Sequence, residues 1–321
     1  MAFKLPAMAP AGLWRRTPPA IFPPILGLLG LALAWRRGAG EFGVPQGAAD
    51  MLMGAVTLLF IFSTITYVAK LMRRPAVVND DLKVLPGRAG LAAGVLCLYL
   101  FAGALTPFSA EQARPVLILG LAVHLVLALL LVRLFITGPA EQRRVTPVWH
   151  LSFTGFIVAA MVAQGLGLSG LTWGLFWLSL LVAVLIWVIS ADQFRRLRVP
   201  APLRPLLAIH LAPASLLGVV ALGMGMPGLA LGFGVLSVLL LAAMVLGVRW
   251  LLAAGFSPLW GALTFPLAAT ANFWVALGGA WRIPGGILLV LATLIIVPIA
   301  VQVLKLWAKG QLAVKTNAAI A

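Results

Sequence analysis

"TFPLAATANFW", residues 264–274, is the stretch that decides the fold, because it places a proline, two threonines and an asparagine inside an apolar, membrane-length segment. A proline inside a helix removes a backbone hydrogen bond and frees the carbonyl one turn earlier. Lipid cannot satisfy that carbonyl, so such a helix must lie among other helices or line a water-filled cavity. The stretch therefore predicts an interior helix of a larger membrane bundle.

The composition of the whole chain agrees with this prediction. Of the 321 residues, 63% are hydrophobic and only 9% are charged, and the mean hydropathy is +1.11. A soluble domain is about 25% charged, and a β-barrel would alternate apolar with polar residues instead of forming long apolar runs. The fold class is therefore an all-α polytopic membrane protein. The basic residues lie singly or in pairs, which argues against a nucleic-acid-binding patch.

A window of about 19 residues predicts ten transmembrane spans. They cover 18–36, 50–72, 88–106, 114–136, 148–166, 170–190, 205–223, 228–248, 258–278 and 284–308. Most of the outer connections are short, so consecutive spans pair as five helical hairpins. Because no segment remains for a separate soluble domain, we expect residues 1–321 to form one membrane domain.

Positive charge predicts the orientation of the spans. With the N-terminus inside, only Arg36, Arg37, Arg114 and Arg282 of the 23 basic residues fall on the outer side, and the rest, from Lys4 to Lys315, fall inside. Lys and Arg are retained in cytoplasmic loops. Both termini are therefore predicted to be cytoplasmic.

Proline placement separates odd spans from even ones. Spans 1, 7 and 9 have prolines inside the apolar run, and span 5 has a glycine flanked by hydroxyl residues, whereas spans 2, 6 and 8 have no internal proline. The odd-span residues are Pro23, Pro24, Gly155, Pro213 and Pro266, while span 3 and Pro298 of span 10 break the rule. The pattern favours odd helices inside and even helices outside, and the simpler alternative is ordinary packing kinks.

The sequence lacks catalytic and metal-binding patterns. All seven carboxylates lie in loops or at span ends, so no acid is positioned as a proton relay within the membrane. Cys97 is the only cysteine, and no group of histidines and carboxylates has metal-ligand spacing. No glycine-rich phosphate loop with a lysine is present. We therefore expect no enzyme, no metal and no cofactor.

Three histidines are the remaining titratable candidates. His150 and His210 lie near the ends of spans 5 and 7, where hydrogen-bonded structural roles are favoured over proton transfer. His124 lies nearer the middle of an even span, and an interhelical hydrogen bond is the favoured interpretation.

Four stretches carry a family resemblance. "TPPAIFPPILGLLGLALAWR" at 17–36, "VWHLSFTGFIVAA" at 148–160, "RPLLAIHLAPASLLG" at 204–218 and "FSPLWGALTFPLAATA" at 256–271 resemble the TehA and SLAC1-type family. This family is also called the tellurite-resistance, slow anion channel or C4-dicarboxylate transporter family. The resemblance implies ten helices in five hairpins around a central pore, and a homotrimer with one pore per protomer. We expect a bacterial inner (cytoplasmic) membrane location.

The resemblance also implies a gate. In this family a phenylalanine of helix 9 plugs the pore, and the matching residue is Phe265 of the TFPL motif. Without the resemblance, packing would be the simpler role for this ring. The other candidate pore-lining or kink residues are Phe22, Pro23, Gly155, Pro213, Thr264, Pro266 and Thr270. Asn272 either satisfies backbone groups or contacts the pore.

The predicted function is passage of small inorganic or carboxylate anions through a phenylalanine-gated pore in membrane lipid. The alternative is a secondary carrier for C4-dicarboxylates or an exporter of tellurite or related oxyanions. A membrane scaffold or enzyme is disfavoured because no catalytic cluster exists and the interior helices are broken.

Overall fold

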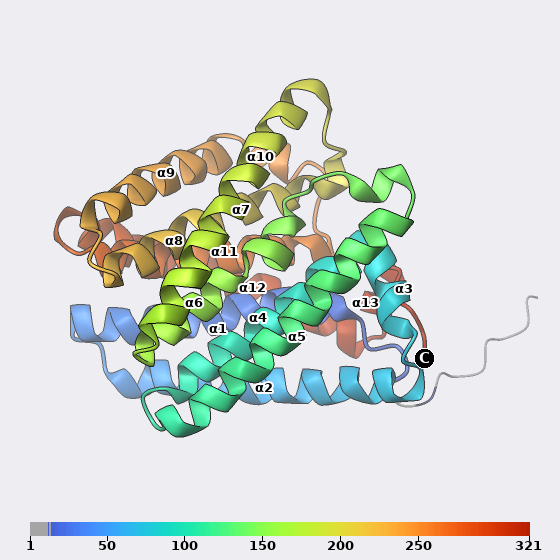
Figure 1. The fold of residues 1–321 in the computed structure, drawn as a ribbon, viewed down its shortest axis with the longest axis horizontal. Helices are drawn as coiled ribbons and strands as arrows, with labels where there is room; N and C mark the ends of the chain where they lie inside the picture. The colour runs from blue at the N-terminus through green and yellow to red at the C-terminus, as the bar shows by residue number, and fades with distance from the viewer. Residues whose placement is uncertain (1–11, 13) are drawn as a thin grey trace, which may run out of the picture.

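The structure is a computed structural model that describes residue 12 and residues 14–321, and this part of the chain is helical and contains no β-strand (Figure 1). Lys4, which the orientation argument counted on the inner side, lies outside the described residues. The long helices are α1 (Phe22–Phe42), α2 (Gln46–Arg73), α4 (Leu85–Leu105), α5 (Ala110–Thr137), α7 (Ser169–Arg196), α8 (Leu211–Gly223), α9 (Pro227–Leu246) and α12 (Arg282–Ala308). Counted with the 3-10 turns that precede some of them, these are eight helical segments long and apolar enough to cross a membrane within the described residues.

Two of the ten predicted spans are not single continuous α-helices. The span predicted at 148–166 consists of a π-helical turn, η3 (His150–Thr154), followed by α6 (Phe156–Gly165). The span predicted at 258–278 consists of the 3-10 turn η5 (Pro258–Trp260) and α11 (Gly261–Leu277), which has 17 residues. Three short helices were not predicted at all: α3 (Val77–Lys83), α10 (Val248–Leu251) and α13 (Gln311–Lys315).

Burial divides the helices into two sets. In the most apolar part of the segments containing α1, α4 and α8, 72% to 78% of residues are buried within the protein, and α11 buries nearly all of its residues. The corresponding value for α2, α5, α7, α9 and α12 is only 22% to 39%, and these helices carry most of the exposed large apolar side chains. The poorly buried set is therefore suited to face lipid, while the well-buried set forms the interior.

The interior helices begin irregularly, and most of their prolines lie where a 3-10 segment becomes an α-helix. The 3-10 segments η1 (Pro19–Ile21) and η4 (Ala201–His210) lead directly into α1 and α8. Pro23, Pro24 and Pro213 consequently lie in the first turn of an α-helix, where proline is tolerated better than in the helix interior. Only Pro266 of this group lies inside its helix. Pro213 lies near the middle of the membrane-length segment Ala201–Gly223, as the sequence predicted, and Pro23 and Pro24 lie near the start of Pro19–Phe42. Hydropathy does not reveal where a 3-10 segment becomes an α-helix, so the sequence did not predict these junctions.

Helices α1 and α11 approach one another closely at two glycines. A Cβ atom on Gly27 would collide with the side chain of Thr264. A Cβ atom on Gly30 would lie 3.0 Å from Cδ2 and 3.1 Å from Cε2 of the Phe265 ring. Small residues allow membrane helices to pack at such short range. The contact fixes the position of Phe265 against the backbone of α1.

Candidate functional site

Phe265 lies near the start of α11 and is buried, with an exposed fraction of 5%. Phe265 forms part of the wall of a small cavity between interior helical segments. The cavity is lined by Leu96, His150, Leu151, Thr154, Gly155, Ile157, Val158, Ile209, Ala212, Pro213, Leu216 and Phe265. These residues come from α4, η3, α6, η4, α8 and α11, and none comes from the poorly buried helices.

The cavity is narrow and electrically neutral in its side-chain composition. Its volume is about 10 Å³, which is the space that about one water molecule needs. Only His150 and Thr154 contribute polar side chains to the lining, and no lining residue is acidic, lysine or arginine. A constriction of this kind blocks ions by steric exclusion and dewetting rather than by charge.

His150 of the cavity lining contacts a second histidine, His210, from another helical segment. Nε2 of His150 lies 3.0 Å from Nδ1 of His210, and Nδ1 of His150 lies 3.2 Å from Oγ1 of Thr154. The indole Nε1 of Trp187 donates to the His210 carbonyl oxygen at 3.2 Å. The prediction that both histidines are hydrogen-bonded is confirmed, but their pairing was not predicted. A signal for it was present: "HLSFTG" and "HLAPAS" each place a histidine just before an interior α-helix.

His124 performs the interhelical role that the sequence favoured. Its Nε2 lies 3.0 Å from the carbonyl oxygen of Ser152, and its Nδ1 lies 3.0 Å from the Tyr99 hydroxyl. Because a carbonyl only accepts, Nε2 carries the proton and Nδ1 accepts from Tyr99. The imidazole also stacks on Phe156, with ring centroids 3.9 Å apart. His124 of α5 therefore links α4 to the π-helical turn that precedes α6.

The structure separates the other predicted pore residues. Gly155 and Pro213 line the cavity together with Phe265. Phe22 does not, because its ring packs against Phe60 and Tyr67 of α2, with centroids 6.4 and 6.2 Å away. Phe22 therefore lies outside the lining of this cavity, and its side chain contacts a peripheral helix.

The predicted threonines satisfy backbone carbonyls beside the cavity instead of lining it. Oγ1 of Thr264 lies 2.7 Å from the carbonyl oxygen of Gly261 and 3.2 Å from that of Pro23. Oγ1 of Thr270 lies 2.8 Å from the carbonyl oxygen of Pro266. Both hydroxyl groups therefore donate to backbone carbonyls close to the prolines.

Two further side-chain bonds hold α11 to its neighbours. Thr270 Oγ1 lies 2.8 Å from Ser215 Oγ of α8. Asn272 Oδ1 accepts a hydrogen bond from Nε of Arg37 in α1 at 2.9 Å. The open question about Asn272 thus has a specific answer, which is a contact with a basic side chain. Across the described residues, no group of three histidine, cysteine or acidic side chains is placed to hold a metal ion.

Comparison with known families adds the assignment that the geometry alone does not give. No curated protein matches the chain. The family model of SLAC1, described as voltage-dependent anion channel, matches residues 16–306. This range contains all of the cavity-lining residues and every long helix, apart from the last two residues of α12. The members of this family are anion channels and not enzymes. The apolar, membrane-length helices of the described residues make this chain an integral membrane protein. The chain belongs to the SLAC1 family of voltage-dependent anion channels.

Proposed function

We propose that this protein conducts anions through a pore along its interior helices and that Phe265 closes the pore. The observation that carries the proposal is the position of this ring, which lies against Gly30 and forms the wall of a cavity of about 10 Å³. The ring occupies space that a hydrated anion would need. Family membership supports anions as the conducted species.

We propose that the chain crosses the membrane ten times, through the eight long segments together with α6 and α11. Odd crossings lie inside, even crossings lie outside, and successive crossings pair as five hairpins. The contrast in burial between the two sets supports this arrangement. Both chain ends would face the cytoplasm. The hydrogen bond from Ala321 N to Arg15 O supports their lying on the same side, because it joins the two ends of the described chain.

Passive passage of small inorganic or carboxylate anions is the favoured transport mode. The absence of any acidic lining residue supports uncoupled flux, because proton-coupled carriers use titratable relays, most often with carboxylates. His150 is the one titratable side chain in the lining, and it is held by hydrogen bonds to Thr154 and His210. Arg37 supports a preference for anions, because it sets a positive charge about 10 Å along α1 from Gly30. We also propose, from the family resemblance, that the protein forms a homotrimer in a bacterial inner membrane.

The gate is tested by replacing Phe265 with alanine. We expect Phe265→Ala to raise anion conductance in planar bilayers at least tenfold, because the ring no longer fills the constriction. Phe22→Ala is the matched control, since it removes an equally buried ring that packs on α2. Equal currents from the wild type and Phe265→Ala, with both proteins folded, would refute the assignment of the gate.

Recording in bilayers and liposomes also separates the channel from the alternative transport modes. A channel gives current that follows the electrochemical gradient and does not saturate at low substrate concentration. A carrier for C4-dicarboxylates or tellurite gives saturable uptake and counterflow. Counterflow of malate without ohmic current would favour the carrier over the proposed channel.

A further inference from the structure

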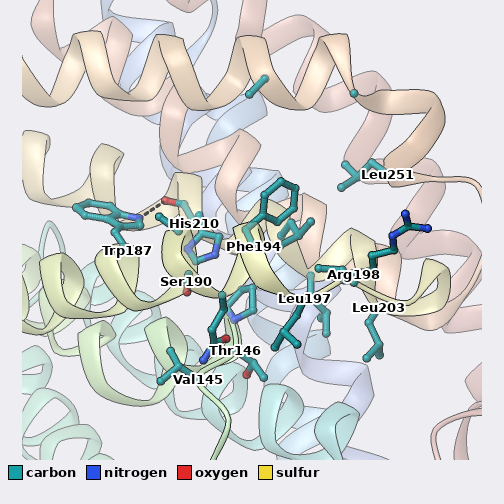
Figure 2. Close-up of a pocket in the computed structure, with 18 of the residues that line it drawn as sticks. Val145, Thr146, Trp187, Ser190, Phe194, Leu197, Arg198, Leu203, His210 and Leu251 are labelled. Atoms are coloured by element: carbon teal, nitrogen blue, oxygen red, sulfur yellow. Dashed lines mark hydrogen bonds between the residues drawn. The ribbon is translucent and has the colours of Figure 1, made fainter.

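A second, much larger pocket lies away from the candidate pore. It has a volume of about 780 Å³ and is formed by α7, η4, α9, α10 and the loop residues 144–147 (Figure 2). Its wall is largely apolar, with leucines such as Leu203, Leu207, Leu236 and Leu240. Pockets that hold a complete small molecule usually have about 300 to 1,000 Å³.

The pocket has one charged end. Arg144, Arg195 and Arg198 line it at the side where α7 ends, and Figure 2 shows Arg198 at one edge of the group. These arginines are exposed, and none of the three has a hydrogen-bond or ion-pair partner among the described residues. No acidic residue lines the pocket. The nearby Asp192 is already bound to Arg196, at 3.0 Å.

The dimensions of the pocket match one leaflet of a bilayer. Along α7, the lining runs from Trp187 to Arg195, about 12 Å at the helical rise. Along α9, it runs from Leu236 to Gly247, about 16 Å. Half of a hydrocarbon core is about 15 Å thick. The basic end lies on the side where the distribution of Lys and Arg predicts the cytoplasm.

We propose that this pocket binds an anionic phospholipid of the cytoplasmic leaflet, with an acyl chain between α7 and α9 and the phosphate at Arg144, Arg195 and Arg198. Basic pockets between membrane helices on the cytoplasmic side are suited to anionic head groups. Two lining residues, Thr146 and Ser190, also have hydroxyl groups without a hydrogen-bond partner in the described structure. At the deep end, His210 forms part of the wall and contacts His150 of the small cavity. The lipid would thus lie one histidine pair away from Phe265.

The head-group contact is tested with the full chain, purified and delipidated in detergent. Binding of phosphatidylglycerol and phosphatidylcholine is measured by native mass spectrometry. We expect phosphatidylglycerol to bind at least tenfold more tightly, and Arg195→Gln/Arg198→Gln to remove most of that preference. The control Arg133→Gln/Lys309→Gln removes two exposed basic residues that do not line the pocket, and it should change affinity less than twofold.

The acyl-chain contact has its own matched pair of variants. Ala243→Phe places a ring in the pocket and should weaken phosphatidylglycerol binding at least tenfold, whereas Ala242→Phe alters an exposed neighbour outside the pocket and should not. Equal binding of the two lipids would overturn the proposal. So would displacement of the lipid by millimolar inorganic phosphate, which would indicate a site for a free anion. Unchanged binding in Ala243→Phe would exclude the pocket as the place of the acyl chain.

Discussion

Two buried polar clusters in this molecule are held together by different interactions, one by an ion pair and the other by hydrogen bonds between histidine and threonine side chains. The ion-pair cluster consists of Tyr67, Lys70 and Asp81, and both charged side chains in it are fully buried, with Nζ of Lys70 2.9 Å from Oδ2 of Asp81. The histidine cluster consists of His150, Thr154 and His210, which are joined by hydrogen bonds without a lysine, arginine or carboxylate.

The partners of the ion-pair cluster explain why charge is tolerated there. Nζ of Lys70 also donates to the carbonyl oxygen of Thr17 at 3.0 Å, and Oδ1 of Asp81 accepts from the backbone N–H of Ala319 at 2.8 Å. The Tyr67 hydroxyl donates to Asp81 Oδ2 at 3.0 Å. The pair therefore fastens both ends of the described chain to α2 and α3. Fixed charge holds the chain ends together, whereas the polar groups beside the cavity are two histidines and a threonine that bond to one another.

Removing one charge of the ion-pair cluster should have the largest effect on stability. We expect Asp81→Asn to lower the free energy of unfolding by about 3 to 5 kcal/mol, because it leaves Lys70 buried without its counter-charge. The measurement is unfolding in mixed detergent micelles by titration with sodium dodecyl sulfate.

The adjacent Asp80 provides the control. Its carboxylate bonds to Lys83 and Arg74 at the exposed surface, so Asp80→Asn should cost less than about 1 kcal/mol. If the two variants were equally stable, the buried pair would not be the fastening that the contacts suggest.

The ion-pair cluster also shows how far sequence reasoning reaches. The sequence correctly placed every carboxylate, Asp81 among them, outside the middle of a span, and it counted Lys70 with the inner-side basic residues. It did not predict their burial, because burial depends on α3 folding against α2 and on the tail reaching Asp81. Hydropathy and charge counts contain no information about such long-range contacts.

The interior of the protein also has features that the sequence predicted and contacts that it did not predict. Proline content identified most of the well-buried helices, and the hydroxyl residues of "TFPLAATANFW" do serve the backbone. Family resemblance, not the residue pattern, identified Phe265 as the candidate gate. The structure adds that Phe265 lines a narrow cavity. The outward orientation of Phe22 and the contact between His150 and His210 depend on the rotation of helices about their axes, which single-sequence patterns in wholly apolar helices do not define.

Breaking the histidine cluster should have an intermediate effect. His210→Phe leaves Nε2 of His150 without its partner in a buried site, which should cost about 1 to 3 kcal/mol of unfolding free energy. The double variant His150→Phe/His210→Phe should cost less than the sum of the two single variants, because their shared bond is lost only once. The same detergent titration measures all three variants, and strict additivity would show that the contact contributes nothing.

The smallest effect on stability should come from the hydroxyl at the edge of the histidine cluster. Thr154→Val removes the partner of His150 Nδ1 and should cost about 1 kcal/mol, similar to Thr172→Val, whose hydroxyl bonds only to its own helix at the Leu168 carbonyl. The two variants should differ in conductance, because only Thr154 lines the cavity. In a Phe265→Ala background, the added methyl group makes the constriction more apolar and favours dewetting, so Thr154→Val should lower the anion current while Thr172→Val leaves it unchanged. Equal currents in the two double variants would mean that the cavity at Thr154 does not lie on the path of the anion.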